Sequence, residues 1–255
     1  MSAVHTTTTT AAQPEFPNIV SMLAERYEGT AFGHFLSTWE SIIFSVLVIA
    51  LLTAFAYFAT RKRQLVPTGL QNVAELLVSG IDDFVCSLLG PKGHKYTPFI
   101  GTLFIYILAM NYIGLIPFFR SPTADWSVTF GLAIIVFCYV QYTAFKELGF
   151  LGYGDHLMGK PRGVLALSII MPIFMLLLHL IGELFRPISL SLRLRSNIWG
   201  DDILLALLAG GGLAGLPVLF VNMLLVFLTA TIQAVIFSLL TTIYFALILV
   251  HEDEH

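Results

Sequence analysis

The sequence predicts an all-α polytopic membrane protein, and three observations indicate this class. Of the 255 residues, 57% are hydrophobic and only 11% are charged, whereas about 25% of the residues in a soluble domain are charged. Apolar segments about 20 residues long, enough for a helix to cross a bilayer, recur along the chain. The last of them, Val218–Val250, contains no charged residue. We therefore expect five membrane-spanning helices and one amphipathic surface helix, the last two spans being long and steeply tilted as a hairpin.

We expect residues 1–36 to form a polar N-terminal tail outside the cell, followed by a single transmembrane helical domain over residues 37–255. The segment "HTTTTTAAQPEFP" is typical of a disordered tail. It lacks the basic start, apolar core and cleavage site of a signal peptide. It also lacks the arginines of an organellar transit sequence, which favours a bacterial protein.

Composition limits the function classes. The net charge of −3 gives no indication of a nucleic-acid partner. Cys86 and Cys138 are far apart without metal or redox spacing, so we interpret them as small packing residues. No cofactor and no metal site is predicted.

Basic residues predict the orientation of the spans. The five segments are Ser41–Ala59, Thr97–Phe119, Val128–Phe145, Val164–Phe185 and Val218–Val250, of which the third is marginal in length. Lysines and arginines concentrate at 61–63 and at 146–162, whereas 120–127 holds one arginine. Because basic loops stay in the cytoplasm, we expect the N-terminus outside and the C-terminus in the cytoplasm.

The segment between Pro67 and Gly90 predicts the surface helix. Its apolar residues recur every three or four positions, which is typical of one helix face: Leu70, Val73, Leu77, Ile81, Phe84 and Leu88. Its acidic residues argue against a sixth span and favour a helix lying on the cytoplasmic surface.

The two last apolar segments are unusually long. A helix from Val164 to about Leu208 would be about 67 Å long, and one over Val218–Val250 about 50 Å. Both exceed a hydrocarbon core of about 30 Å, so they must tilt or break. The glycine-rich turn at Gly210–Pro217 makes them an antiparallel hairpin.

Charged residues lie within this hairpin, in "ISLSLRLRSNIWGDD", Ile188–Asp202. A charge near the membrane centre costs at least about 2.5–3.5 kcal/mol, so it indicates function. Viewed along the axis of one continuous helix, His179 would lie within about 40° of Arg193. Asp202 would lie about 180° from Arg193, and Arg195 about 160° from it. Glu183 also lies on the predicted helix from Val164 to about Leu208. Arginine keeps its proton, whereas carboxylates and histidine exchange theirs, so a fixed cation with titratable groups on two faces suits two separate proton paths.

Structural interpretations stay open for several of these residues. Arg186 before Pro187 is compatible with a helix break or with snorkelling to the interface. Arg195 is compatible with a structural ion pair with Asp201 or Asp202. Asp202 is correspondingly compatible with a role that only neutralises Arg195. His179 is compatible with a packing histidine.

Four motifs resemble the a-subunit of F-type ATP synthases. "RPISLSLRLRSN" is similar to its arginine signature "SLSLRLFGN", and "NYIGLIP" to its "NLxGLIP". "PTADWSVTFGLA" resembles its "P-x-A-D-x-N-x-T" segment, and "IQAVIFSLLTTIYFALILVHEDEH" its C-terminal helix and tail. The resemblance extends from about Phe35 to the end of the chain, in order and with matching spacing.

The resemblance implies a stator subunit beside a rotating c-subunit ring, with Arg193 as the essential arginine. It matches Gln233 to the family's glutamine, Asp202 to a polar residue nine after the arginine, and Asn197 to the asparagine of "GN". It also matches Asp125 to an aspartate near the outer mouth, and we expect Asn111 on a span lining the same cavity. This sequence departs from the family pattern at three positions. Arg195 and Ser196 replace the Phe and Gly of "RLFGN", and His179 stands where many members carry a carboxylate. The set of proton carriers among His179, Glu183 and Asp202 therefore stays open.

We accordingly expect a non-catalytic, proton-conducting stator subunit in a bacterial inner membrane. Its expected partners are the c-ring, the b-subunits of the peripheral stalk, lipid, and protons or sodium ions. Two rival classes are a secondary ion transporter, disfavoured by the absence of an inverted repeat, and an intramembrane protease or transferase, which lacks paired catalytic motifs.

Overall fold

A computed structural model describes most of the chain. The described residues are 19–27, 30–61, 69–116, 119, 121–158, 174, 177–178, 181–182, 185, 188–189, 191–193, 195–196, 200, 203 and 216–252. The helices are α1 (Ile19–Arg26), α2 (Ala31–Thr60), α3 (Leu70–Leu89), α4 (Thr97–Ile113), α5 (Trp126–Met158) and α7 (Leu216–Glu252). Two short 3₁₀ helices, η1 (Gly90–Lys95) and η2 (Pro122–Ala124), precede α4 and α5. All regular structure within these described residues is helical, which confirms the all-α class.

Three described helices are long and apolar enough to cross a membrane. Their apolar parts are Thr38–Thr60, Trp126–Glu147 and Phe220–Ile248, close to the first, third and fifth predicted spans. The second predicted span is the shorter apolar helix α4, which ends at Ile113 rather than at Phe119. Most of the fourth, Val164–Phe185, lies outside the described residues. Five spans and a terminal hairpin therefore stay predictions.

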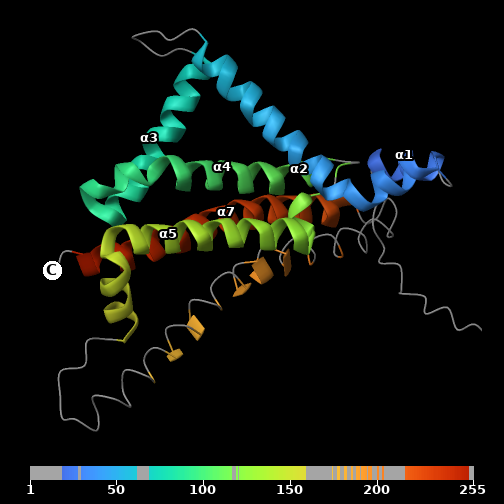
Figure 1. Cartoon of the computed structure of the whole chain (residues 1–255). Helices are drawn as coiled ribbons and strands as arrows, with labels where there is room; N and C mark the ends of the chain where they lie inside the picture. The colour runs from blue at the N-terminus through green and yellow to red at the C-terminus, as the bar shows by residue number, and fades with distance from the viewer. Residues whose placement is uncertain are drawn as a thin grey trace, which may run out of the picture.

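Helices α4, α5 and α7 lie side by side and form the centre of the molecule (Figure 1). Two ring contacts show that α4 and α7 are antiparallel. Tyr96, at the start of α4, stacks on Phe245 at 4.8 Å between ring centres, and Tyr112, at the end of α4, stacks on Phe227. The ring of Phe99 packs against that of Tyr139 of α5, at 4.3 Å between centres and with the ring planes tilted by 33°. The fully buried side chains gather along these contacts and include Ile100, Ile107, Met110, Phe237 and Phe245.

Helices α2 and α3 lean against this centre from one side. They diverge from α4 and meet near the loop that connects them, as Figure 1 shows. The amphipathic segment is helical as predicted, but only the middle of its apolar face, from Leu77 to Phe84, packs on α4 and α7, and Leu88 near its C-terminal end is 41% exposed. Ile81 and Phe84 are partly buried, whereas Leu70 and Val73 are more than half exposed. Val85, outside the predicted face, is fully buried.

The N-terminal segment contains helical structure before residue 37. Helix α1 lies inside the range assigned to the tail, and α2 begins at Ala31. Thr30 caps α2, since its hydroxyl accepts a hydrogen bond from the amide of Gly33. The threonine-rich segment itself lies outside the described residues.

Candidate functional site: a buried polar network between α4, η2 and α7

Asn111, in the last turn of α4, is the centre of a buried polar network. Its side chain is 2% exposed. Its Nδ2 donates to the carbonyl oxygen of Ala230 in α7 at 3.4 Å, and its Oδ1 accepts from the hydroxyl of Thr123 in η2 at 2.8 Å. Buried polar groups are stable only with such partners. Asn111 therefore connects three separate segments.

The turn after α4 brings η2 onto this asparagine. The Ser121 hydroxyl donates to the carbonyl of Met110 at 3.0 Å and shares a hydrogen bond with the Thr123 hydroxyl at 2.6 Å. Gly114 permits this close return, because a Cβ at that position would lie 2.8 Å from the Cβ of Ser121. The glycine of "NYIGLIP" is thus a requirement of the turn.

A second polar contact joins α4 to α7 beside the first. The hydroxyl groups of Tyr112 and Thr231 are 2.7 Å apart, and the Tyr112 ring stacks on Phe227 at 4.9 Å between centres. These contacts position α7 against the end of α4.

Gln233 lies on the buried face of α7, three residues after Ala230. Its side chain is 2% exposed. Asn222, eleven residues earlier and so within about 20° on the same helix face, is 4% exposed. The Nδ2 group of Asn222 has no hydrogen-bond partner in the described structure. The buried face of α7 therefore carries polar side chains at Asn222 and Gln233, about three helical turns apart, although the helix is otherwise mostly apolar.

Asp125 lies between η2 and α5, two residues after Thr123. Its side chain is partly buried, and its carbonyl accepts from both the amide and the hydroxyl of Thr129. Asp125 directly follows η2, and Thr123 of η2 contacts Asn111. The predicted outer aspartate is therefore next to the network in the chain.

Arg193 and Arg195 are both helical in the structure, and their environments differ. The Arg193 side chain is exposed, and no described residue forms an ion pair with it. The Arg195 guanidinium lies over the ring of Trp126, 5.6 Å from its centre.

The structure joins only part of the predicted set. Asn111 is in contact with η2, next to Asp125, and with α7, which carries Gln233. His179, Glu183, Asn197 and Asp202, together with the proposed partner Asp201, lie outside the described residues. Thr123, Tyr112, Thr231 and Trp126 were not predicted. Of these, Thr123 and Trp126 stand in the motif "PTADWSVTFGLA" and Tyr112 in "NYIGLIP", but nothing in the sequence indicated their contacts.

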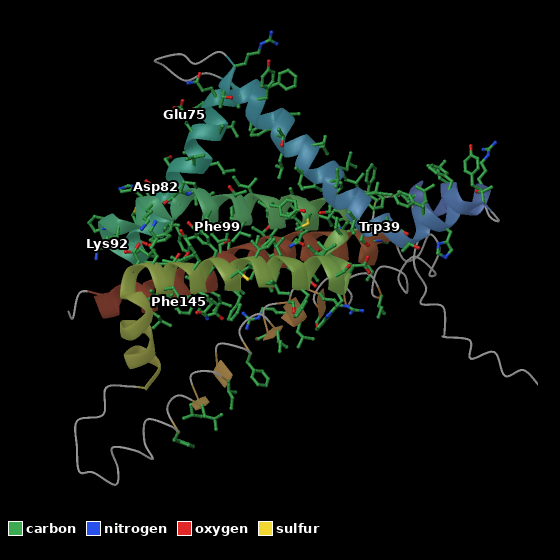
Figure 2. The ribbon with its side chains drawn as sticks, viewed as in Figure 1. Trp39, Glu75, Asp82, Lys92, Phe99 and Phe145 are labelled. Carbon is green, nitrogen blue, oxygen red and sulfur yellow. The ribbon has the colours of Figure 1, made fainter. Side chains whose placement is uncertain are left out.

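Charged contacts lie at the opposite end of α4. Lys95 forms an ion pair with Glu147 of α5. The hydrogen bond to Glu147 raises the pKa of Lys95 above its ordinary value. Lysines before α4 and at the end of the apolar part of α5, Trp126–Glu147, therefore share one end of the bundle, where Figure 2 labels Lys92.

Comparisons with known proteins agree with the motifs. The family described as ATP synthase A chain matches residues 42–246. The ATP synthase subunit a of Protochlamydia amoebophila is 38% identical over 94% of this chain and 92% of its own length. That of Aliarcobacter butzleri is 41% identical over 88% of this chain and 96% of its own length. That of Desulfosudis oleivorans is 36% identical over 86% of this chain. The chain therefore belongs to the a-subunit family of ATP synthases, whose members are ion-translocating membrane subunits of the F-type complex.

Proposed function

We propose that this chain is the proton-conducting stator subunit of a bacterial F-type ATP synthase. Protons enter a half-channel from outside, reach a carboxylate on the c-ring, travel with the ring, and leave through a second half-channel to the cytoplasm. Nucleotide chemistry belongs to other subunits, since "GDHLMGK" (Gly154–Lys160) is followed by Pro161 and the sequence contains no complete P-loop motif "GxxxxGK[ST]". The b-subunits of the peripheral stalk hold the chain in place.

The observation that carries this proposal is the buried network of Asn111. The Thr123 hydroxyl of η2, the Asn111 amide of α4 and the backbone carbonyl of Ala230 in α7 meet in a region otherwise made of apolar helices. Buried polar groups are costly in a membrane and are retained where ions pass. Gln233 lies one helical turn from Ala230 on the same helix, so the network leads from Asp125 toward the family glutamine.

Arg193 has the second role, at the contact with the c-ring. Arginine remains charged, so it attracts a deprotonated carboxylate and prevents a proton from passing directly between the half-channels. Its exposed side chain supports a contact with a partner subunit. Arg195, which lies on Trp126, has a different and secondary role.

The orientation belongs to the proposal as well. Lys95 and Glu147 bring the start of α4 and the apolar end of α5 together, so Lys92, Lys95 and Lys146 concentrate at one end. This supports a cytoplasmic location of that end, with the N-terminus outside. A membrane-impermeant thiol reagent applied to intact cells should fail to label a cysteine placed at Lys92 and should label one placed at Ser127.

Arg193→Ala tests the central role, with Arg195→Phe as the matched control. In inverted vesicles Arg193→Ala should abolish both ATP synthesis driven by a proton gradient and ATP-driven pumping, at normal subunit abundance. Arg195→Phe should retain substantial coupled activity. Normal coupled synthesis by Arg193→Ala would refute the proposal. ATP synthesis that requires a sodium gradient and resists protonophores would show instead that the transported ion is sodium.

A further inference from the structure

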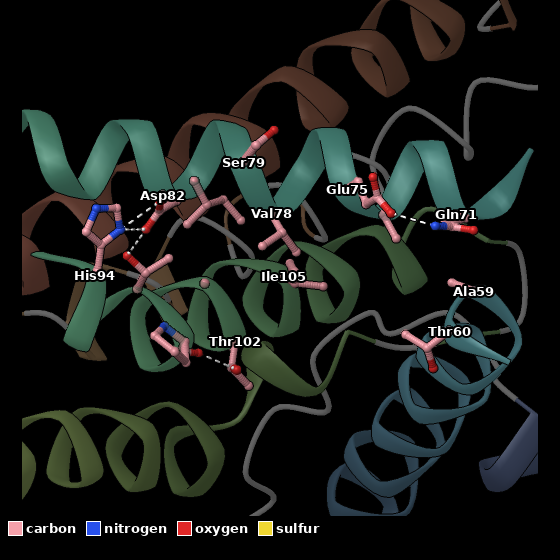
Figure 3. Close-up of a pocket in the computed structure, with 15 residues that line it drawn as sticks. Ala59, Thr60, Gln71, Glu75, Val78, Ser79, Asp82, His94, Thr102 and Ile105 are labelled. Atoms are coloured by element: carbon pink, nitrogen blue, oxygen red, sulfur yellow. Dashed lines mark hydrogen bonds and ion pairs between the residues drawn. The ribbon is translucent and has the colours of Figure 1, made fainter. Parts of the chain in front are cut away.

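Three side chains of different chemistry converge where α3 turns through η1 into α4. Asp82 and Cys86 are one turn apart on α3, and His94 lies on η1. The Nδ1 atom of His94 lies 3.0 Å from Oδ1 and 2.9 Å from Oδ2 of Asp82. The Cys86 sulfur lies 3.5 Å from Nδ1 of His94 and 3.7 Å from Oδ1 of Asp82. Figure 3 shows the contact between His94 and Asp82.

The local sequence produces this convergence. A spacing of four residues places Asp82 and Cys86 on the same side of α3. Gly90, at φ +67°, ends the helix and donates its amide to the carbonyl of Cys86. At Gly93, any Cβ would lie 3.1 Å from the Cα and 3.2 Å from the sulfur of Cys86. Glycine therefore favours the close return of η1 that brings His94 beside the thiol, since a larger residue would have to displace Cys86 by a few tenths of an ångström.

Thr97 fixes the carboxylate from the next helix. Its hydroxyl is buried and donates to Oδ1 of Asp82 at 2.6 Å. This hydrogen bond is the main reason why the pKa of Asp82 lies below its ordinary value, with smaller contributions from His94 and Cys86. Hydrogen bonds of this kind, behind a metal ligand, orient the ligand and raise metal affinity.

The three ligand atoms have the spacing of one face of a zinc tetrahedron. Zinc binds sulfur at about 2.3 Å and nitrogen or oxygen at about 2.0 Å. At the tetrahedral angle these lengths give edges of about 3.5 Å from sulfur to nitrogen or oxygen and about 3.3 Å from nitrogen to oxygen. The corresponding distances here are 3.5, 3.7 and 3.0 Å. A movement of a few tenths of an ångström therefore suffices to accept the ion.

We propose that Asp82, Cys86 and His94 bind a zinc ion, with the fourth coordination position open to solvent. Asp82 and His94 line a cavity of about 890 Å³ between α2, α3 and α4, so water can reach the ion. The mixed sulfur, nitrogen and carboxylate ligand set suits Zn²⁺ better than Mg²⁺ or Ca²⁺, which prefer oxygen. This site lies at the end of α4 opposite to Asn111.

Zinc binding has consequences for the cysteine and for the fold. Burial, and next the carboxylate of Asp82, raise the pKa of the Cys86 thiol, so the metal-free thiol is protonated near neutral pH. Zinc displaces that proton, and its affinity therefore rises with pH. The bound ion connects α3 to η1 and holds the corner before α4. Cys86, interpreted from sequence as a packing residue, becomes a ligand.

The test uses the full-length chain in lipid nanodiscs and Zn²⁺ or Co²⁺ alone as the probe. Wild-type protein should bind one zinc ion per chain. Cobalt should give the thiolate charge-transfer band and the intense visible bands of a tetrahedral site. Cys86→Ser should remove the charge-transfer band and weaken zinc binding more than about 10-fold. Thr97→Val, which removes the orienting bond to Asp82 and the longer contact with the Gly93 carbonyl but no ligand, should weaken it by about 10-fold. Cys138→Ser, at the exposed cysteine of α5, is the matched control and should bind like wild type.

Two outcomes would overturn the site. One is equal zinc affinity in Cys86→Ser and Cys138→Ser, and the other is a cobalt spectrum without the thiolate band in wild-type protein. Circular dichroism of each variant identifies any loss of folding. His94→Gln provides a second ligand variant, which keeps a hydrogen-bonding group at η1 and should also lose the ion.

Discussion

The guanidinium of Arg195 lies over the ring of Trp126, 5.6 Å from its centre, although 69 positions separate them in the chain. Trp126 is the first residue of α5 and follows Asp125 directly. A cation over the face of tryptophan is attracted by the ring, with an energy of about 0.5–2 kcal/mol. Arg195 is therefore stabilised by an aromatic side chain, a partner that the sequence did not indicate.

Arg195→Phe should keep substantial coupled activity, because phenylalanine retains a ring contact with Trp126 and Arg193 is untouched. Trp126→Leu should be more harmful, since it leaves the Arg195 charge without its aromatic partner. ATP-driven proton pumping and the melting temperature of the subunit measure both variants. A loss in Arg195→Phe as complete as that in Arg193→Ala would contradict a secondary role.

Asp202→Asn should slow proton flux without uncoupling it, whereas Asp202→Glu and Asp202→His should be tolerated better. On a continuous helix Asp202 would point away from Arg193, where we expect it to line an aqueous cavity rather than meet the rotor carboxylate. A carboxylate in such a cavity can accept and release protons. Passive proton flux through the membrane sector is the measurement.

The alternative for Asp202 is neutralisation of Arg195. The double variant Asp202→Asn/Arg195→Phe separates the two roles, because it removes both charges together. Flux that stays slow would support a role on the proton path. Full recovery of flux would leave Asp202 a structural role alone.

Asn111→Ala should lower both proton flux and stability. It removes the hydrogen bonds to Ala230 and Thr123 at a side chain that is 2% exposed, and we expect a loss of about 1–3 kcal/mol. Thr123→Val is the matched control, since it also removes a bond of Asn111 but leaves the amide in place. It should destabilise the protein while retaining most of the flux. Equal loss of flux in the two variants would indicate that Asn111 acts only through packing.

The ion pair of Lys95 and Glu147 should contribute modestly to stability. The Lys95 side chain is 55% exposed and that of Glu147 is 19% exposed, so solvent weakens the attraction to about 0.2–1 kcal/mol. A double-mutant cycle with Lys95→Met and Glu147→Gln, followed by thermal unfolding in detergent, measures the coupling. The coupling should shrink in high salt. A coupling above about 3 kcal/mol would show a pair far less solvated than the structure indicates.

The sequence alone determined the class of the protein and the positions of most helices. The charge-free segment Val218–Val250 predicted α7, which extends from Leu216 to Glu252. The spacing of apolar residues likewise predicted α3. These predictions succeed because transfer to lipid and helical periodicity depend on residues close together in the chain. The motifs determined the family for a related reason, since each motif is a short continuous segment.

Only the tertiary structure decided which side chains meet. Helix packing places Thr123 on Asn111 and Trp126 under Arg195. The apolar face of α3 was predicted as one continuous stripe, yet α4 and α7 cover only its middle, from Leu77 to Phe84. At η1, two glycines and a tight turn join His94 to Asp82 and Cys86, although the cysteine spacing had indicated no metal site. Such contacts depend on the angles at which helices cross and on the course of the turns between them, and a one-dimensional pattern contains neither.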